Sequence, residues 1–168
     1  MKAIVYTSNA GSTARYAKLL AHETGLPVYS AQEAKKQLPA RKEILYLGWI
    51  MAGGIRGWQE AAKRFRVCAV CGVGMCQTGT QVQELREKNA IPGEIPLFTL
   101  QGSFDLEKLH GVYKMMMKIM VKSLAQKEAR TPEEEDMLDM LEHGGDRVRF
   151  ENLKAVLDWY SAGRGAHL

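Results

Sequence analysis

The chain has 168 residues, of which 46% are hydrophobic and 25% charged, values typical of one globular domain with a sizeable core. Its net charge is +4, and no apolar run approaches the roughly 20 residues that cross a bilayer. The first residues turn polar too quickly for a signal peptide, so we expect a soluble, cytoplasmic domain over residues 1–168, with no nucleic-acid partner.

Short apolar runs alternate with helical patterns along the first hundred residues. We expect strands at residues 2–6, 27–30, 43–48, 66–71 and 95–100, and helices at residues 13–23, 56–64 and 81–88. Because the strands are apolar on both faces and alternate with helices, the sheet should be parallel and covered on both sides. The pattern therefore predicts an α/β fold of three layers, with a doubly wound five-stranded parallel sheet.

The last third of the chain has a purely helical pattern. One long helix is expected at residues 104–126, and Thr131 is the predicted N-cap of a second helix, with Glu134 completing a capping box. Apolar residues at helical spacing indicate a last helix: Leu153, Val156, Leu157 and Tyr160. We therefore expect extra helices after the fifth strand, as a helical insertion at residues 104–147 before the last helix.

The loop after the first strand consists of small hydroxyl and amide residues without charge. Backbone N–H groups at a helix N-terminus, reinforced by the helix dipole, bind a phosphate dianion. Three other classes of site are excluded, because the sequence has none of their motifs here. A nucleotide triphosphatase loop would need a Gly-Lys-Ser/Thr ending, and a dinucleotide site would need Gly-x-Gly-x-x-Gly. A receiver domain would need an acidic pair after this strand. The alternative is a loop that only caps the helix. The candidate phosphate-binding residues are Ser8, Asn9, Ala10, Gly11, Ser12 and Thr13.

The segment at residues 4–20 resembles the FMN phosphate-binding signature of flavodoxins. The matching residues are Ile4, Val5, Tyr6, Ser8, Gly11, Thr13, Ala17 and Leu20. The chain is similar, to about Leu100, to the flavodoxin-domain family that includes menaquinone-dependent protoporphyrinogen dehydrogenase. That family also has a glycine- and aromatic-containing segment after the third strand, like residues 48–55, and a late Met/Lys-rich segment, like residues 115–120. The resemblance implies strand order 2-1-3-4-5, with FMN at the switch point between strands one and three.

Two loops should hold the isoalloxazine ring, one at residues 49–54 and the other at residues 72–78. The candidate ring-binding residues are Trp49, Ile50, Met51, Ala52, Gly53, Gly72, Val73, Gly74 and Met75. Trp49 offers a face for stacking, and the glycines allow main-chain N–H groups to approach the ring edge. The alternatives are a core tryptophan and ordinary turn glycines. Flavodoxins usually carry a second aromatic residue after the fourth strand, and its absence here would leave the flavin open to a substrate.

The three cysteines do not form a disulfide framework, because they are odd in number and crowded together. Cys68 and Cys71 lie three residues apart on a strand, so they should point to opposite faces and remain buried thiols. Cys76, in the expected flavin loop, is the best candidate for a reactive thiol. We predict no metal site and assign no catalytic residue.

Lys114, Lys118 and Lys122 form a basic stripe on the methionine-rich helix. Such a helix can make peripheral contact with a membrane through residues 114–122, form the wall of a substrate site, or pack in a homodimer or a core.

The sequence therefore favours an FMN-dependent oxidoreductase of flavodoxin type that transfers electrons to a quinone- or porphyrinogen-like small molecule. One alternative is an electron-transfer flavodoxin that serves a redox partner protein. A binding module that has kept the fold without the flavin is another, because a fold alone does not determine function.

Overall fold

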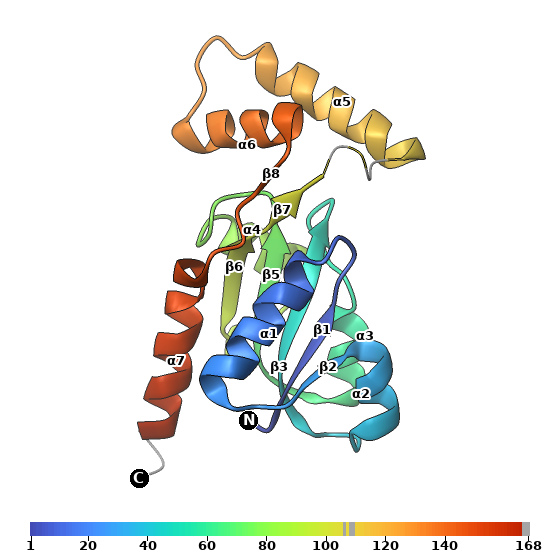
Figure 1. The fold of residues 1–168 in the computed structure, drawn as a ribbon, viewed down its shortest axis with the longest axis vertical. Helices are drawn as coiled ribbons and strands as arrows, with labels where there is room; N and C mark the ends of the chain where they lie inside the picture. Colours follow the sequence, from blue (N-terminus) through green and yellow to red (C-terminus); the bar gives the residue numbers. More distant parts are fainter. Residues whose placement is uncertain (106, 108–109, 166–168) are drawn as a thin grey trace.

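The computed structural model describes residues 1–105, 107 and 110–165, and its centre is a mostly parallel sheet (Figure 1). The five parallel strands are β1 (Ala3–Thr7), β2 (Val28–Ser30), β3 (Glu43–Met51), β5 (Arg66–Gly74) and β6 (Leu97–Gln101). They lie side by side in the order β2-β1-β3-β5-β6. The expectation of an α/β fold with about five parallel strands is confirmed.

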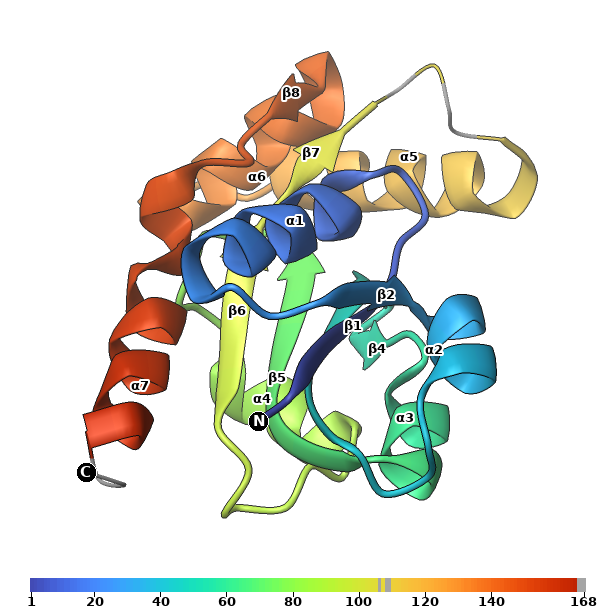
Figure 2. The same cartoon turned by 60° about the horizontal axis from the view of Figure 1, so that its bottom comes forward.

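Helices cover both faces of the sheet (Figure 2). One face carries α1 (Ser12–Thr24) and α7 (Lys154–Gly165), and the other carries α2 (Ala31–Gln37), α3 (Trp58–Arg64) and α4 (Val82–Lys88). Successive residues of β3 alternate between the two cores: Ile44 and Tyr46 pack in the core of the second face, whereas Leu45 and Leu47 pack with α1. This double burial explains the continuous apolar runs.

Two strands extend beyond their predicted ends. β3 continues to Met51 and turns back through the short strand β4 (Gly54–Ile55), and β5 continues to Gly74. The expected loops at residues 49–54 and 72–78 were therefore wrong in extent, because Trp49, Ile50 and Met51 pair within the sheet, as do Gly72, Val73 and Gly74. Outside the strands remain Ala52 and Gly53 at the hairpin tip and the segment at residues 75–78.

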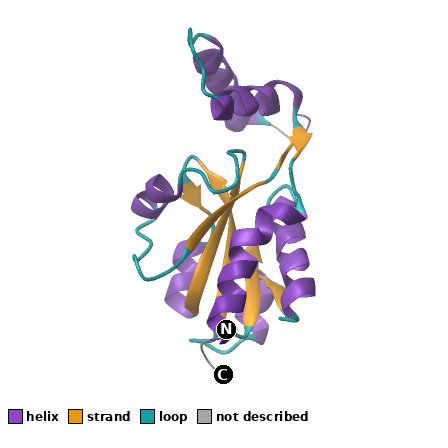
Figure 3. Cartoon of the chain, turned by 90° about the vertical axis from the view of Figure 1, so that its left-hand side faces the viewer, coloured by secondary structure: helices purple, strands orange, loops and turns teal. Residues whose placement is uncertain are grey.

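A helical hairpin lies beyond the C-terminal ends of the parallel strands, apart from the three-layer body (Figure 3). It consists of α5 (Gly111–Ala125) and α6 (Pro132–His143), and the antiparallel pair β7 (Ser103–Phe104) and β8 (Gly145–Asp146) connects it to the body. The capping box of α6 is confirmed. The expected helix start at residue 104 was wrong, because Phe104 pairs with Gly145 in the two-stranded ribbon. Residues 106, 108 and 109 of that prediction lie outside the described residues.

After β8, a short 3-10 helix, η2 (Phe150–Leu153), leads into α7. Among the described residues, no helix is long and apolar enough to cross a membrane.

Candidate cofactor site

The turn at residues 8–11 leads from β1 into the N-terminus of α1. Gly11 is the N-cap residue with φ +100, a left-handed conformation, and no side chain caps the helix. The Gly11 N–H donates to Ser8 Oγ at 3.2 Å, and the first helical bond runs from Arg15 N to Gly11 O at 3.0 Å. The N–H groups of the intervening residues therefore have no helical acceptor, and they carry the positive end of the helix dipole. Asn9 and Ala10, just before this cap, are exposed.

The two hydroxyl residues that open α1 differ in their surroundings. Ser12 Oγ lies 2.5 Å from Ser103 Oγ and accepts from Ser103 N at 2.9 Å, so β7 already engages this hydroxyl. Thr13 is 1% exposed, and no hydrogen bond joins its hydroxyl to another described residue. Side-chain donors for an anion are therefore Ser8 and Thr13, and Ser12 offers its main chain.

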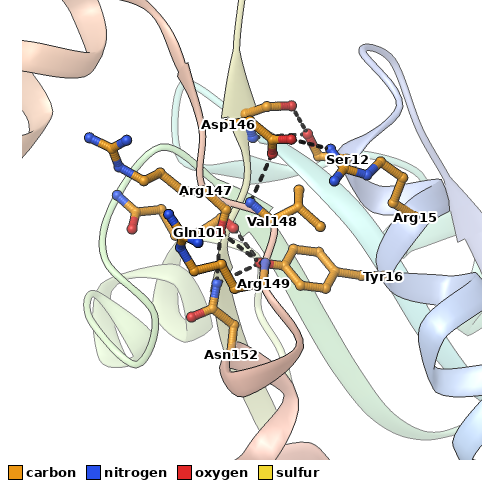
Figure 4. Close-up of polar contacts among 10 residues, drawn as sticks. Ser12, Arg15, Tyr16, Gln101, Asp146, Arg147, Val148, Arg149 and Asn152 are labelled. Carbon is orange, nitrogen blue, oxygen red and sulfur yellow. Dashed lines mark hydrogen bonds and ion pairs between the residues drawn. The ribbon is translucent and has the colours of Figure 1, made fainter.

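Tyr16, one turn further along α1, connects this helix to the C-terminal segment (Figure 4). Its hydroxyl donates to Gln101 O at 2.5 Å and accepts from Asn152 Nδ2 at 2.6 Å. Burial raises the pKa of this phenol, so it stays protonated as a donor. Arg15 forms an ion pair with Asp146 at 2.7 Å. These contacts hold the ribbon of β7 and β8 beside the first turns of α1.

The order of the sheet reverses between β1 and β3, and the helices that follow these two strands, α1 and α3, cover opposite faces. Thr7, the last residue of β1, lies beside Gly48 in the ladder. Tyr46 Oη donates to Arg56 O at 2.6 Å and lies 2.9 Å from Thr7 Oγ1, and burial raises its pKa to about 12. A cavity of about 370 Å³ lies here between α2 and α3, bounded by Thr7, Tyr46 and Gly57. It contains none of the predicted cofactor-binding residues.

The β3–β4 hairpin carries the first group of predicted ring-binding residues. Trp49 is half-buried, and the Arg56 guanidinium lies 5.7 Å from the centre of its ring, over one face. Ile50 packs where side chains at Gly72 and Gly74 would lie, since a Cβ at either glycine would be 3.1 Å from Ile50 Cδ1. The absence of side chains at Gly72 and Gly74 therefore leaves space for Ile50 on this face of β5.

The hairpin tip is held by Asn89, which sequence reasoning did not identify. Its Nδ2 donates to Gly53 O at 2.9 Å, its Oδ1 accepts from Ile55 N at 2.7 Å, and its main-chain oxygen accepts from Trp58 Nε1 at 3.0 Å. Asn89 is 8% exposed. The sequence signal was only an asparagine after a predicted helix, which is also an ordinary C-cap pattern.

The segment at residues 75–78 is held by Gln101 at the end of β6. Gln101 Nε2 donates to Met75 O at 3.0 Å and to Asp136 Oδ2 at 2.6 Å, and its main-chain N–H donates to Thr78 Oγ1 at 2.9 Å. Asp136 belongs to α6, so one amide side chain connects this segment to the helical hairpin. Gln101 was not among the predicted site residues either.

The cysteines are in environments that favour the thiol. Burial raises the pKa of Cys76, with a further contribution from the Glu84 charge, and its Sγ donates to Gln81 Oε1 at 3.0 Å. Burial also raises the pKa values of Cys68 and Cys71. The interpretation of Cys76 as a reactive thiol therefore loses its physical basis, which requires a lowered pKa.

Three segments thus meet at one edge of the sheet: the turn into α1, the β3–β4 hairpin, and residues 75–78 after β5. No group of three or more His, Cys, Asp or Glu side chains that could hold a metal ion occurs within the described part of the chain. In comparisons with protein-family models, curated proteins and solved structures, none matches the chain.

Proposed function

We propose that the protein binds FMN in a flavodoxin-like arrangement and acts as an FMN-dependent oxidoreductase. The observation that carries this proposal is the uncharged, uncapped N-terminus of α1, immediately after the strand at which the sheet order reverses. Counted over the parallel strands alone, the order is 2-1-3-4-5, which supports a flavodoxin-like topology.

In this arrangement the FMN phosphate accepts hydrogen bonds from the main chain at the start of α1 and from the hydroxyls of Ser8 and Thr13. A charge-free site of this kind suits a monophosphate dianion, because the helix dipole supplies the complementary field. The isoalloxazine lies at the same edge, between the hairpin that carries Trp49 and the segment that begins at Met75. Bound FMN supplies the electron-transfer chemistry, and the protein positions it and limits access to it.

The electron acceptor is proposed to be a flat, apolar small molecule, quinone-like or porphyrinogen-like. The support is the composition of the two ring-binding segments: Trp49 is aromatic, whereas residues 72–78 contain no aromatic residue. A ring covered by an aromatic side chain on one face leaves the other face accessible to a small planar molecule. Turnover of a soluble naphthoquinone by the flavin-loaded protein tests this part directly.

The phosphate site is tested by comparing FMN with riboflavin, which lacks the phosphate. Thr13→Val should weaken FMN binding at least about tenfold and leave riboflavin affinity nearly unchanged, because only FMN uses this hydroxyl. Thr24→Val, at the opposite end of α1, is the matched control and should change neither affinity. Equal losses for both ligands would refute a phosphate role for Thr13. Absence of FMN binding by the unaltered protein would refute the proposal itself.

A further inference from the structure

Among the described residues, the helix α5 packs mainly on one side, against α6. None of its residues is buried, and the half-buried ones recur at helical spacing where α5 contacts α6: Met117, Met120, Val121 and Leu124. Figure 1 shows α5 and α6 beside each other, away from the sheet. The rest of the α5 surface faces neither the sheet core nor α6.

A second apolar stripe runs along the exposed side of α5. Val112, Met115, Met116 and Ile119 follow the i, i+3, i+4, i+7 spacing of one helix face. Their side chains are exposed to 64%, 59%, 37% and 64%, respectively. Four neighbouring large apolar side chains at this exposure form a patch of the kind that marks an interaction surface.

The two helices of the hairpin carry opposite charges. α5 contains three lysines and no acidic residue, whereas α6 contains six acidic residues and no lysine or arginine. Lys114, Lys118 and Lys122 form no ion pair with another described residue, and neither do Glu135 and Glu142 on α6. The hairpin therefore presents an unpaired basic stripe and unpaired acidic groups on adjacent helices.

We propose that the α5–α6 hairpin pairs with the hairpin of a second copy of this chain around a two-fold axis. Each apolar stripe of α5 is then covered by the partner copy, and the lysines of one α5 lie beside the acidic α6 of the other. A two-fold interface is self-complementary, so one basic and one acidic helix per copy satisfy both halves at once. An anionic membrane would attract the lysines but repel the six acidic residues of α6, so a second copy fits the charges better.

The first test measures the mass of the full chain by light scattering and sedimentation over a roughly hundredfold range of concentration. We expect the unaltered protein to reach the dimer mass. Ile119→Glu should raise the dissociation constant of the dimer at least about tenfold and so remain monomeric over this range. Phe150→Glu is the matched control, because Phe150 is 45% exposed but lies outside the hairpin. It should keep the dimer mass.

The second test exchanges the charges. One variant carries Lys118→Glu and Lys122→Glu, and another carries Glu135→Lys and Glu142→Lys. Each variant alone should be monomeric, because the exchanged side chains of one copy then face unexchanged side chains of the same sign on the other copy. An equimolar mixture should form a heterodimer, because each exchanged pair then faces side chains of opposite sign.

Three outcomes would overturn the proposal. The first is an unaltered protein that stays monomeric throughout the range, and the second is a dimer that Ile119→Glu leaves intact. The third is a monomer that sediments with phosphatidylglycerol vesicles and loses this binding on Ile119→Glu, which would identify the stripe as a membrane contact.

Discussion

Replacement of Asn89 by alanine should loosen the β3–β4 hairpin from the rest of the domain. The substitution removes the side-chain bonds to Gly53 O and from Ile55 N. The bond from the Trp58 indole survives, because its acceptor is the main-chain oxygen of Asn89. Leu85 O also keeps a partner, since the main-chain N–H of Asn89 donates to it at 3.0 Å. Two polar groups therefore lose their partners.

The cost follows from the burial of these two groups. Ile55 is 5% exposed, so water cannot replace the lost acceptor of its N–H, whereas Gly53 is half-buried and its carbonyl is partly solvated. An unsatisfied buried group costs about 1–3 kcal/mol, and the two together should reduce the free energy of unfolding by about 2–4 kcal/mol. For a chain of this length, this corresponds to a decrease in Tm of about 5–15 °C.

Urea unfolding of the apoprotein, followed by circular dichroism, measures this loss. Asn9→Ala is the matched control, because Asn9 is exposed and forms no hydrogen bond with another described residue, and its effect should be below about 0.5 kcal/mol. If FMN binds as proposed, Asn89→Ala should also weaken FMN and riboflavin equally, because the hairpin faces the ring and not the phosphate. A loss of stability no larger than that of Asn9→Ala would refute the reasoning.

Two further predictions concern Tyr46 and Gly57, which border the cavity between α2 and α3. Gly57→Ala should be clearly more destabilising than Gly79→Ala in thermal unfolding: both glycines have positive φ (+79 and +86), but a Cβ at Gly57 would lie 2.1 Å from Tyr46 Oη, whereas nothing lies within 4 Å at Gly79. Equal losses in the two variants would show that Tyr46 moves away from position 57 without a cost in stability. The pKa of Tyr46 is raised from 10.0 to about 12, so its contribution to stability is complete below pH 10 and is lost as the pH rises towards 12, by roughly 2–3 kcal/mol. Unfolding measured across this interval should show a smaller alkaline loss in Tyr46→Phe, and an unchanged loss would contradict the assignment.

The fold class could be predicted because the relevant signals are local and repeated. Each parallel strand is apolar on both faces, as β3 shows with Ile44 in one core and Leu45 in the other. The helix α2 was not predicted, although Ser30 and Glu33 form a capping box at its start. Its seven residues have a single buried side chain, Ala34, so the periodic apolar signal was absent.

The first part of the candidate site could also be predicted, because its residues are consecutive in the sequence. The rest of the site depends on contacts between residues that are far apart in the sequence. The turn from β1 into α1 is contiguous, and its small residues are visible in the sequence. The hydroxyl of Ser12 is engaged by Ser103, and the hairpin tip is fixed by Asn89, which is 36 residues from Gly53. Neither Ser103 nor Asn89 is part of a recognisable sequence motif. A single polar residue of this kind contacts the site only because the folded sheet brings it there.

At Gly72 and Gly74 the sequence predicts a close approach by another group but does not identify that group. Glycine in a strand indicates that another group approaches closely, and the sequence suggested a flavin. In the structure Ile50, from the neighbouring strand, takes that place on one side. A flavin bound as proposed would therefore meet main-chain donors chiefly from residues 75–78, beyond the end of β5. That segment is positioned by Gln101, which bonds to Met75 O and Asp136 together. The chemistry of the proposed site would thus depend on a glutamine that the sequence alone gives no reason to select.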